Sequence, residues 1–251
     1  METELYEYFF RAEETHWWFR ARRRILAAVL DRMYPDTAKT PLRIADLGCG
    51  TGGMLPVLAR YGKVTGVDEA PEAREYCARS GFPDVLTPQE WHAEGGTYDL
   101  VTAFDVIEHV QDDVTFLKGV SDRLGPGGRL LATVPAYPFL WSAFDEMNHH
   151  YRRYTRRTLE QSLGAAGFTV LRLTHMNAWL FPALAGARLL ERAFGREPES
   201  EAERRRALDV WFRVRPWDGA LERIFASERI WLRAADFPFG ASILTLARKP
   251  S

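Results

Sequence analysis

Four glycines follow a short apolar segment early in the chain. Residues 44–53 read Ile-Ala-Asp-Leu-Gly-Cys-Gly-Thr-Gly-Gly, and the next apolar segment, 63–68, ends at the carboxylate Asp68. Glycines that follow a buried strand let backbone N–H groups approach a ligand where a Cβ would collide. An acid at the tip of the next parallel strand is positioned to accept both hydroxyls of a ribose. The two segments therefore predict an α/β fold that binds a ribose-containing ligand.

The spacing of the glycines distinguishes between the kinds of ligand that such a turn can bind. A dinucleotide fingerprint is Gly-x-Gly-x-x-Gly, and a P-loop has a lysine after its last glycine. This chain has Gly-x-Gly-x-Gly-Gly over residues 48–53 and no lysine in the P-loop position, so a cradle for nucleotide phosphates is not expected. A tight turn that binds nothing and an NAD-type oxidoreductase remain as alternatives.

Residues 46–52, Asp-Leu-Gly-Cys-Gly-Thr-Gly, resemble the first motif of the class I S-adenosylmethionine-dependent methyltransferases, and Val67-Asp68 resembles the second. In that family the glycine turn faces the methionine part of the cofactor, and the acid holds the ribose. The resemblance implies S-adenosylmethionine as the cofactor, with Asp46 near its amino group. The cofactor-binding residues that it implies in this part of the chain are Asp46, Gly48, Cys49, Gly50, Gly52, Asp68, Phe104 and Asp105.

Apolar runs alternate with helical patterns along most of the chain. This alternation predicts a parallel sheet covered on both faces, with ligands at the carboxyl ends of the strands. The resemblance adds a last strand that runs antiparallel between the fifth and the sixth, so the expected fold class is a doubly wound, seven-stranded, Rossmann-like α/β sheet. The predicted strands are 42–47, 63–68, 83–87, 98–104, 128–135, 167–174 and 241–248, and the predicted core helices are 54–61, 71–80, 112–124 and 155–166.

About 65 residues separate the last two predicted strands, where a hairpin needs only a few. This gap contains an apolar segment, 178–194, a charged stretch, 196–206, and a predicted helix over 208–234. We interpret the gap as a helical cap inserted between strands six and seven. The expected domain organisation is an aromatic helical lid over 1–40, a core over 41–177 and 235–251, and the cap over 178–234.

The apolar segment 178–194 also raises the question of a membrane. It is shorter than the roughly 20 apolar residues that span a bilayer, and Arg188 interrupts it. A cap or core helix is the favoured interpretation. Peripheral contact with a membrane surface is the alternative, because Trp211, Trp217 and Trp231 lie near several arginines.

Composition limits the classes of partner and the cellular compartment that we expect. The 251 residues have a net charge of −1, and 46% of them are hydrophobic, which predicts a folded domain without a dedicated nucleic-acid surface. The two cysteines are Cys49 and Cys77, and neither is expected in a disulfide. The acidic, aromatic N-terminus does not resemble a signal peptide, so we expect a cytoplasmic protein.

Aromatic residues are frequent before the first strand, above all in 6–10 and 16–23. One interpretation is a helix that packs its aromatic face on the sheet. The other is a lid over the cofactor cleft, where aromatic rings favour a sulfonium cation. Residues 16–23 resemble the Trp-Trp-Phe-x-x-Arg segment of many bacterial small-molecule methyltransferases. We expect Trp18 at the cofactor, and Arg22 or Arg20 at the carboxylate of its methionine part.

The segment 98–110 ends in three residues suited to acid–base chemistry, Asp105, Glu108 and His109. Their spacing predicts that they share one face of a helix at the mouth of the cleft. The segment resembles the fourth methyltransferase motif, in which Asp105 or its neighbours line the transfer site. An alternative role for Glu108 and His109 is to cap and pack that helix.

The acid-x-x-Glu-His pattern resembles the divalent-metal site of the ubiquinone-pathway O-methyltransferases and of the small-RNA 2′-O-methyltransferases. The RNA enzymes add a distal histidine, which His150 matches here. The resemblance implies a Mg²⁺ or Mn²⁺ site that acidifies a substrate hydroxyl, formed by Asp105, Glu108, His109 and His150. Without a metal, His109 or His150 is the expected general base. The expected catalytic residues are His109, His150 and Asp105.

Aromatic residues and two arginines, Arg152 and Arg153, follow the fifth predicted strand, where the acceptor is expected. They suggest an apolar acceptor with an anionic group; alternatively, the arginines pair with Asp145 and Glu146. Thr155 is expected to cap the next helix. The resemblance as a whole implies methylation of a small-molecule or lipid-like acceptor, at oxygen. A non-catalytic S-adenosylmethionine-binding protein is the alternative from another functional class.

Overall fold

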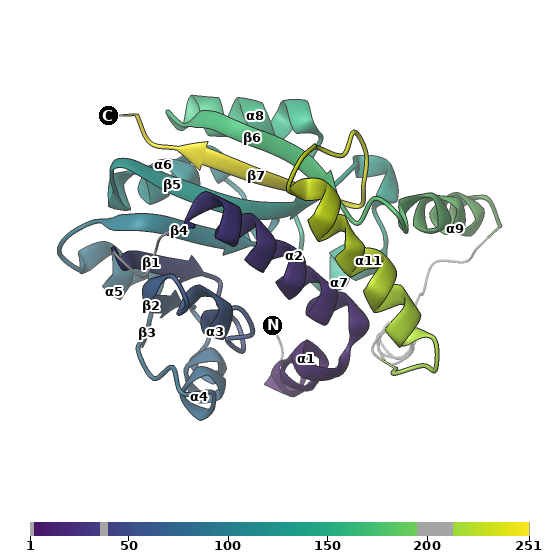
Figure 1. Cartoon of the computed structure of the whole chain (residues 1–251), viewed down its shortest axis with the longest axis horizontal. Coiled ribbons are helices and arrows are strands. Elements are labelled where there is room, and N and C mark those ends of the chain that lie inside the picture. The colour runs from purple at the N-terminus through teal and green to yellow at the C-terminus, as the bar shows by residue number, and fades with distance from the viewer. Residues whose placement is uncertain (1–2, 36–39, 195–212, 251) are drawn as a thin grey trace.

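Seven strands form one sheet, and they are β1 (Leu42–Leu47), β2 (Gly62–Val67), β3 (Val85–Leu86), β4 (Tyr98–Phe104), β5 (Leu124–Pro135), β6 (Thr169–Met176) and β7 (Ser242–Arg248). The structure is a computed structural model that describes residues 3–35, 40–194 and 213–250. The strand order is β3-β2-β1-β4-β5-β7-β6 (Figure 1). Neighbours from β3 to β5 pair in parallel, and β7 runs antiparallel to both β5 and β6. The predicted fold class is confirmed.

The carboxyl ends of three neighbouring strands lie side by side. Leu47 at the end of β1 pairs with Val67 of β2 and with Ala103 of β4. The next residues along these strands are the glycine loop, Asp68 and the segment that contains Asp105. The strand register therefore brings the informative parts of the sequence to one edge of the sheet.

Helices cover both faces of the sheet, and they are α1 (Thr3–Thr15), α2 (Trp17–Met33), α3 (Leu55–Leu58), α4 (Pro71–Arg79), α5 (Pro88–Ala93), the 3₁₀ helices η1 (Ile107–His109) and η2 (Pro138–Leu140), α6 (Asp113–Arg123), α7 (Ala143–Met147), α8 (Arg156–Ala165), α9 (Phe181–Phe194) and α11 (Asp218–Leu232). Successive strand residues point to opposite faces. Ile44 and Leu100 belong to the core beneath α2 and α11, whereas Ala45 and Val101 belong to the core beneath α6 and α8. The sheet is therefore wound on both sides.

The helical insertion between β6 and β7 contains α9 and α11. Helix α11 lies along α2, and α9 extends away from the body of the molecule (Figure 1). Of the residues that the structure describes, none form a helix long and apolar enough to cross a membrane. The charged stretch 196–206 and Trp211 lie outside the described residues.

The aromatic N-terminal segment forms two helices with different surroundings. Helix α2 packs on the sheet, where Ile25 and Leu30 are fully buried. Helix α1 lies against α4 on the side of the glycine loop, with the rings of Phe10 and Tyr76 4.9 Å apart. Helix α2 is thus the packed helix of the first interpretation, and a lid over the cofactor cleft remains a prediction for α1.

Several predicted boundaries are wrong. Strand β5 begins at Leu124 instead of residue 128, because a bulge lets the Pro-Gly-Gly segment join the sheet. Strand β3 has two residues instead of five, and α5, which Thr87 caps, was not predicted. The helix predicted over 208–234 begins at Asp218 in the described part of the chain, since residues 213–215 are not helical.

The prediction that Asp105, Glu108 and His109 share one helical face is also wrong. Asp105 has a φ of +56° and lies before the helix. Glu108 and His109 lie on the single 3₁₀ turn η1, in which the side chains are arranged three to a turn. Asp105 therefore does not share a helical face with Glu108 and His109.

Candidate functional site

The glycine loop after β1 is shaped by its neighbours. Gly48 has a φ of +63°, and a Cβ on it would lie 2.6 Å from Cγ2 of Val106. Its N–H donates to the carbonyl of Val67 over 2.7 Å. No larger residue fits this position without moving the loop, so the backbone approaches closely at the place where the sequence predicts a ligand.

Asp68 lies beside the same loop at the end of β2. Its carboxylate accepts hydrogen bonds from the N–H of Gly50 over 2.9 Å and of Ala70 over 3.0 Å. These bonds fix the carboxylate at the strand tip, which is the position from which an acid reaches a ribose. Gly50 and Gly52 both have positive φ values and continue the loop. Their contact with a cofactor remains a prediction.

An open cavity lies between this loop and the N-terminal helices, with about 470 Å³ of empty space that includes open solvent. Five of its residues were predicted to bind the cofactor: Arg22, Asp46, Gly48, Cys49 and Phe104. The other five were not singled out in the sequence: Glu13, Phe19, Arg23, Gly53 and Met54.

Two carboxyl groups of the cavity wall, those of Asp46 and Glu13, have raised pKa values. Burial raises the pKa of Asp46 to about 7, although a hydrogen bond from Thr102 over 2.6 Å opposes the shift. Burial also raises the pKa of Glu13 to about 7, against hydrogen bonds from Thr51 and from the N–H of Gly53. Both groups would ionise more easily beside a cationic ligand.

Arg22 links α2 to the ends of two strands. Its guanidinium lies 2.7 Å from the carboxylate of Asp105 and 2.6 Å from the hydroxyl of Thr133. The guanidinium also lies over the ring of Trp18, 4.8 Å from its centre. Arg20, the other arginine considered for the cofactor, instead pairs with Glu222 of α11. Of the two, Arg22 is therefore the one that lines the cavity.

Arg23 is the second arginine of the cavity wall, and sequence reasoning missed it. Burial lowers its pKa, and the nearby Glu13 opposes that shift. The cavity therefore combines two guanidinium groups and two carboxyl groups. A zwitterionic amino-acid group needs both kinds of partner.

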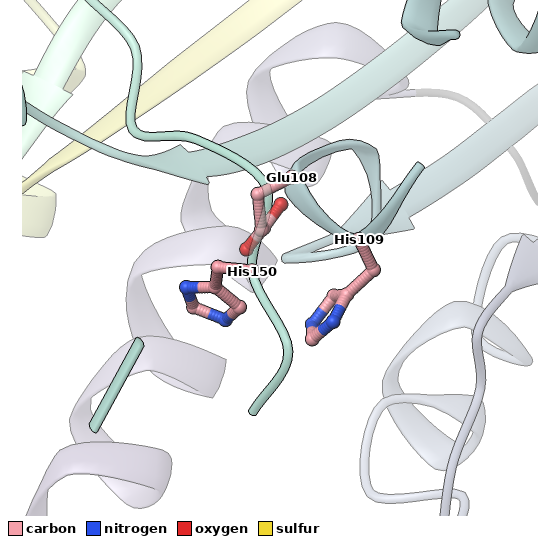
Figure 2. A group of neighbouring side chains, drawn as sticks. All are labelled: Glu108, His109 and His150. Carbon is pink, nitrogen blue, oxygen red and sulfur yellow. The ribbon is translucent and has the colours of Figure 1, made fainter. Parts of the chain in front are cut away.

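Three potential metal ligands converge near this cavity: Glu108, His109 and His150 (Figure 2). Their ligand atoms lie within 4.8 Å of one another, and the two imidazole rings meet edge to face with centres 4.6 Å apart. The predicted fourth ligand, Asp105, pairs with Arg22 and is not part of this group.

Glu108 is the most unusual member of the group. Its side chain is 0% exposed, and neither carboxylate oxygen has a hydrogen-bond partner among the described residues. Burial, and then the nearby charge of Asp105, raise its pKa well above the usual value. A buried carboxyl group without partners is costly, and a bound cation would remove that cost.

The two histidines are suited to bind a cation or to take a proton. Burial, and then the neighbouring His150, lower the pKa of His109 to about 4, so its imidazole is neutral at pH 7. His150 Nδ1 lies 2.9 Å from Oδ1 of Asp145. If Nδ1 donates to this carboxylate, Nε2 is left free to bind or accept a proton.

Asp145, which the sequence offered as a partner of the arginines, is also a positioning residue for His150. It is fully buried, and Arg153 binds it through two nitrogens at 2.8 and 2.9 Å. Burial alone would raise its pKa, but the hydrogen bonds from His150 and Arg153 lower it below the usual value. The pair holds His150 in a fixed orientation.

The arginines after β5 are engaged within the protein. The guanidinium of Arg153 pairs with Asp145, and that of Arg152 lies 3.4 Å from the carboxylate of Asp113. Arg153 is therefore already engaged and is not available to bind an anionic group of the acceptor. Thr155 caps α8 as predicted, by accepting from the N–H of Thr158.

Cys49 belongs to the glycine loop, and Cys77 lies on α4 beside it. Both are buried and free, as expected, with their sulfur atoms 4.0 Å apart.

The fold and the site define a class of protein: an α/β domain with a glycine-lined cavity at the carboxyl edge of its sheet. The family model of the methyltransferase domain matches residues 18–173, which is more than half of the chain. The chain belongs to this methyltransferase-domain family.

Curated relatives agree with this assignment. The chain is 37% identical over 99 residues to the ubiquinone biosynthesis O-methyltransferase of Methylobacterium sp. (strain 4-46), covering 36% of this chain and 40% of the relative. It is 32% identical over 146 residues to the enzyme of the same name from Methylocella silvestris, covering 50% of this chain and 57% of the relative. The chain thus spans about half the length of the curated relatives it matches.

Solved structures share the fold at low identity. A SAM-dependent methyltransferase from Archaeoglobus fulgidus superposes with a TM-score of 0.53 and 17% identity, over 90% of this chain and 94% of that one. An N-methyltransferase from Bradyrhizobium japonicum, bound to S-adenosylhomocysteine, gives 0.50 and 13%, over 93% and 88%. These likenesses concern the arrangement of the sheet and helices.

Proposed function

We propose that the protein is an S-adenosylmethionine-dependent methyltransferase that methylates a hydroxyl oxygen of a small-molecule or lipid-like acceptor. The observation that carries this proposal is the pairing of a glycine-lined cavity with an adjacent cluster of Glu108, His109 and His150. Membership of the methyltransferase-domain family supports the chemistry. The name of the curated relatives, ubiquinone biosynthesis O-methyltransferase, supports oxygen as the methylated atom.

The cavity offers partners for the amino-acid end of the cofactor, and Asp68 lies beside the adjoining loop. Asp46 and Glu13 are the proposed partners of the ammonium group, and Arg22 and Arg23 those of the carboxylate. Asp68 is the proposed partner of the ribose hydroxyls. The sulfonium supplies the electrophile, so the protein mainly has to align the methyl group with the acceptor oxygen and exclude water.

The cluster of Glu108, His109 and His150 fits a divalent cation, Mg²⁺ or Mn²⁺. The carboxyl group of Glu108 supports this, because it is buried and has no hydrogen-bond partner among the described residues. A bound cation would be its partner. When bound, such an ion makes a substrate hydroxyl more acidic. Asp105 remains a proposed member of the transfer site, at the junction of this cluster with the cavity.

The histidines have a role with or without the ion. His109 is neutral at pH 7 because of its lowered pKa, and Asp145 fixes the orientation of His150. Either Nε2 atom can accept the proton of an acceptor hydroxyl as the methyl group is transferred. A protonated His150 would be stabilised by the carboxylate of Asp145, 2.9 Å from its Nδ1.

The experiment is a release assay for S-adenosylhomocysteine with a panel of phenols, catechols and primary alcohols. We expect turnover with at least one hydroxyl acceptor, loss of turnover in Asp68→Ala, and loss after chelation with recovery on addition of Mg²⁺ or Mn²⁺. Turnover only with amine or carbon acceptors would contradict the choice of oxygen. Full turnover after thorough chelation would contradict the metal while leaving the histidine base in place.

A further inference from the structure

Helix α11 presents an apolar stripe to the outside of the molecule. Its inner side packs on α2, where Phe225 is fully buried. Its outer side exposes Ile224, Ile230 and Trp231, whose exposed fractions are 44%, 67% and 48%. Ile224 and Trp231, seven residues apart, lie on the same face of the helix, and Ile230 lies about a third of a turn away from Ile224 on the exposed side. Large apolar side chains at such exposure mark a surface that has a partner.

The exposed charged side chains around this stripe are positive except for Asp236, which pairs with Arg172. Between residues 213 and 235 the three acids, Asp218, Glu222 and Glu228, are all buried. Glu228 accepts three backbone N–H groups, and Glu222 pairs with two arginines of α2. The exposed charged residues of this segment are all arginines: Arg213, Arg223, Arg229 and Arg233. The outer surface of α11 is therefore apolar and positive.

Tryptophans border the stripe. Trp179, in the segment before α9, is 47% exposed, and its ring meets that of Trp231 with centres 6.4 Å apart. Trp217 at the start of α11 is 56% exposed. Tryptophan is favoured where an apolar phase meets water, and arginine is favoured beside phosphate groups.

We propose that the outer face of α11 lies on the surface of an anionic lipid bilayer. Ile224, Ile230 and Trp231 would enter the boundary between headgroups and acyl chains, and the arginines would face lipid phosphates. A second copy of the chain fits less well, because a symmetric contact through this face would bring arginines toward arginines. The inference is independent of the proposed methyl transfer.

The test is co-sedimentation of the full chain with lipid vesicles at low salt. One set of vesicles is phosphatidylcholine alone, and the other contains about 30% phosphatidylglycerol. We expect the protein to partition onto the anionic vesicles about tenfold more strongly than onto the neutral ones, and to be released by high salt. Absence of binding to the anionic vesicles, or equal binding to both, would overturn the proposal.

Variants test whether the apolar stripe of α11 is responsible for binding to the vesicles. The double variant Ile230→Ser, Trp231→Ser should lose most of the partition, and Arg223→Glu should weaken it. The matched control is Leu171→Ser, which removes a leucine that is 44% exposed on β6. Unchanged melting temperature and S-adenosylhomocysteine affinity show that each variant is folded. If the double variant binds vesicles like the parent, or if it turns a dimer into a monomer on light scattering, the proposal is overturned.

Discussion

The two halves of the site are built in different ways. On the proposed cofactor side, the conformations of Gly48 and Gly50 and the backbone N–H groups around Asp68 shape the loop beside the charged side chains of the cavity. The proposed acceptor side consists of the side chains of Glu108, His109 and His150. The first depends in large part on backbone conformation, and the second depends on the identity and orientation of three side chains.

This difference predicts how each half responds to substitution. The glycine loop of the first half fails when a Cβ enters it. A site built from side chains fails when one ligand or its supporting residue changes. A substitution in one half should therefore weaken binding at that half and leave binding at the other half unchanged.

The largest effect is expected at Glu108. Glu108→Gln removes the one charged ligand of the cluster, so affinity for Mn²⁺ should fall by more than about 100-fold on calorimetric titration, since even supporting residues alter metal affinity by about 10- to 100-fold. Affinity for S-adenosylhomocysteine should change less than twofold. The neighbouring exposed Glu146→Gln is the control and should bind Mn²⁺ normally. A comparable loss in both variants would contradict the assignment.

Gly48→Val tests the other half. The new side chain meets Val106 and imposes a positive φ on a β-branched residue, so affinity for S-adenosylhomocysteine should fall about 10- to 100-fold. Binding of Mn²⁺ should persist. The control is Gly164→Ala in α8, where a Cβ meets nothing within 4 Å. Retention of cofactor affinity in the valine variant would show that the loop does not bind the cofactor.

Asp145→Asn tests the support of His150. Loss of the carboxylate frees the imidazole to rotate, so affinity for Mn²⁺ should fall about tenfold. The variant also loses an ion pair with Arg153 and should melt at a lower temperature. Asp113→Asn, another buried acid that pairs with an arginine nearby, is the matched control. If both variants lose stability but neither loses metal affinity, Asp145 has a structural role alone.

The smallest effect concerns pH on the cofactor side. The pKa of Asp46 is about 7 in the folded protein and near 3.8 ordinarily. Between these pH values, Asp46 is protonated in the folded, ligand-free protein and ionised in the unfolded chain. Stability therefore falls as pH rises from about 4 to about 7. A cationic ammonium favours ionised Asp46, so affinity for S-adenosylhomocysteine should rise about 3- to 10-fold between pH 6 and pH 8. Asp46→Asn should flatten this dependence, and a persistent slope would assign it to Glu13.

The sequence was enough to place the glycine loop and Asp68 at one edge of the sheet, because these parts are close together in the chain. The glycine loop and Asp68 end consecutive strands, and parallel pairing brings such ends together. Glu13 and Arg23 were missed because their partners lie across the fold, and an acid within an aromatic helix has no distinctive local pattern. Their one local signal is the cluster of charged residues between aromatic ones in 10–23.

The acceptor side was only partly predictable. His150 was found by its resemblance to a distal histidine, but Asp145 was not assigned to it, since an acid five residues away also suits a surface ion pair. Asp105 was placed on a helix by its spacing, whereas its left-handed backbone turns it toward Arg22. Spacing rules assume a regular helix, and a single 3₁₀ turn does not obey them.

The most direct test of the two-part site is a crystal structure of the protein with S-adenosylhomocysteine and Mn²⁺, with anomalous scattering recorded at the manganese edge. We predict that the amino-acid end of the ligand occupies the cavity between Arg22 and Asp46, with the ribose at Asp68. The anomalous peak should lie among Glu108, His109 and His150. A ligand bound elsewhere, or a manganese peak away from these three side chains, would contradict the account.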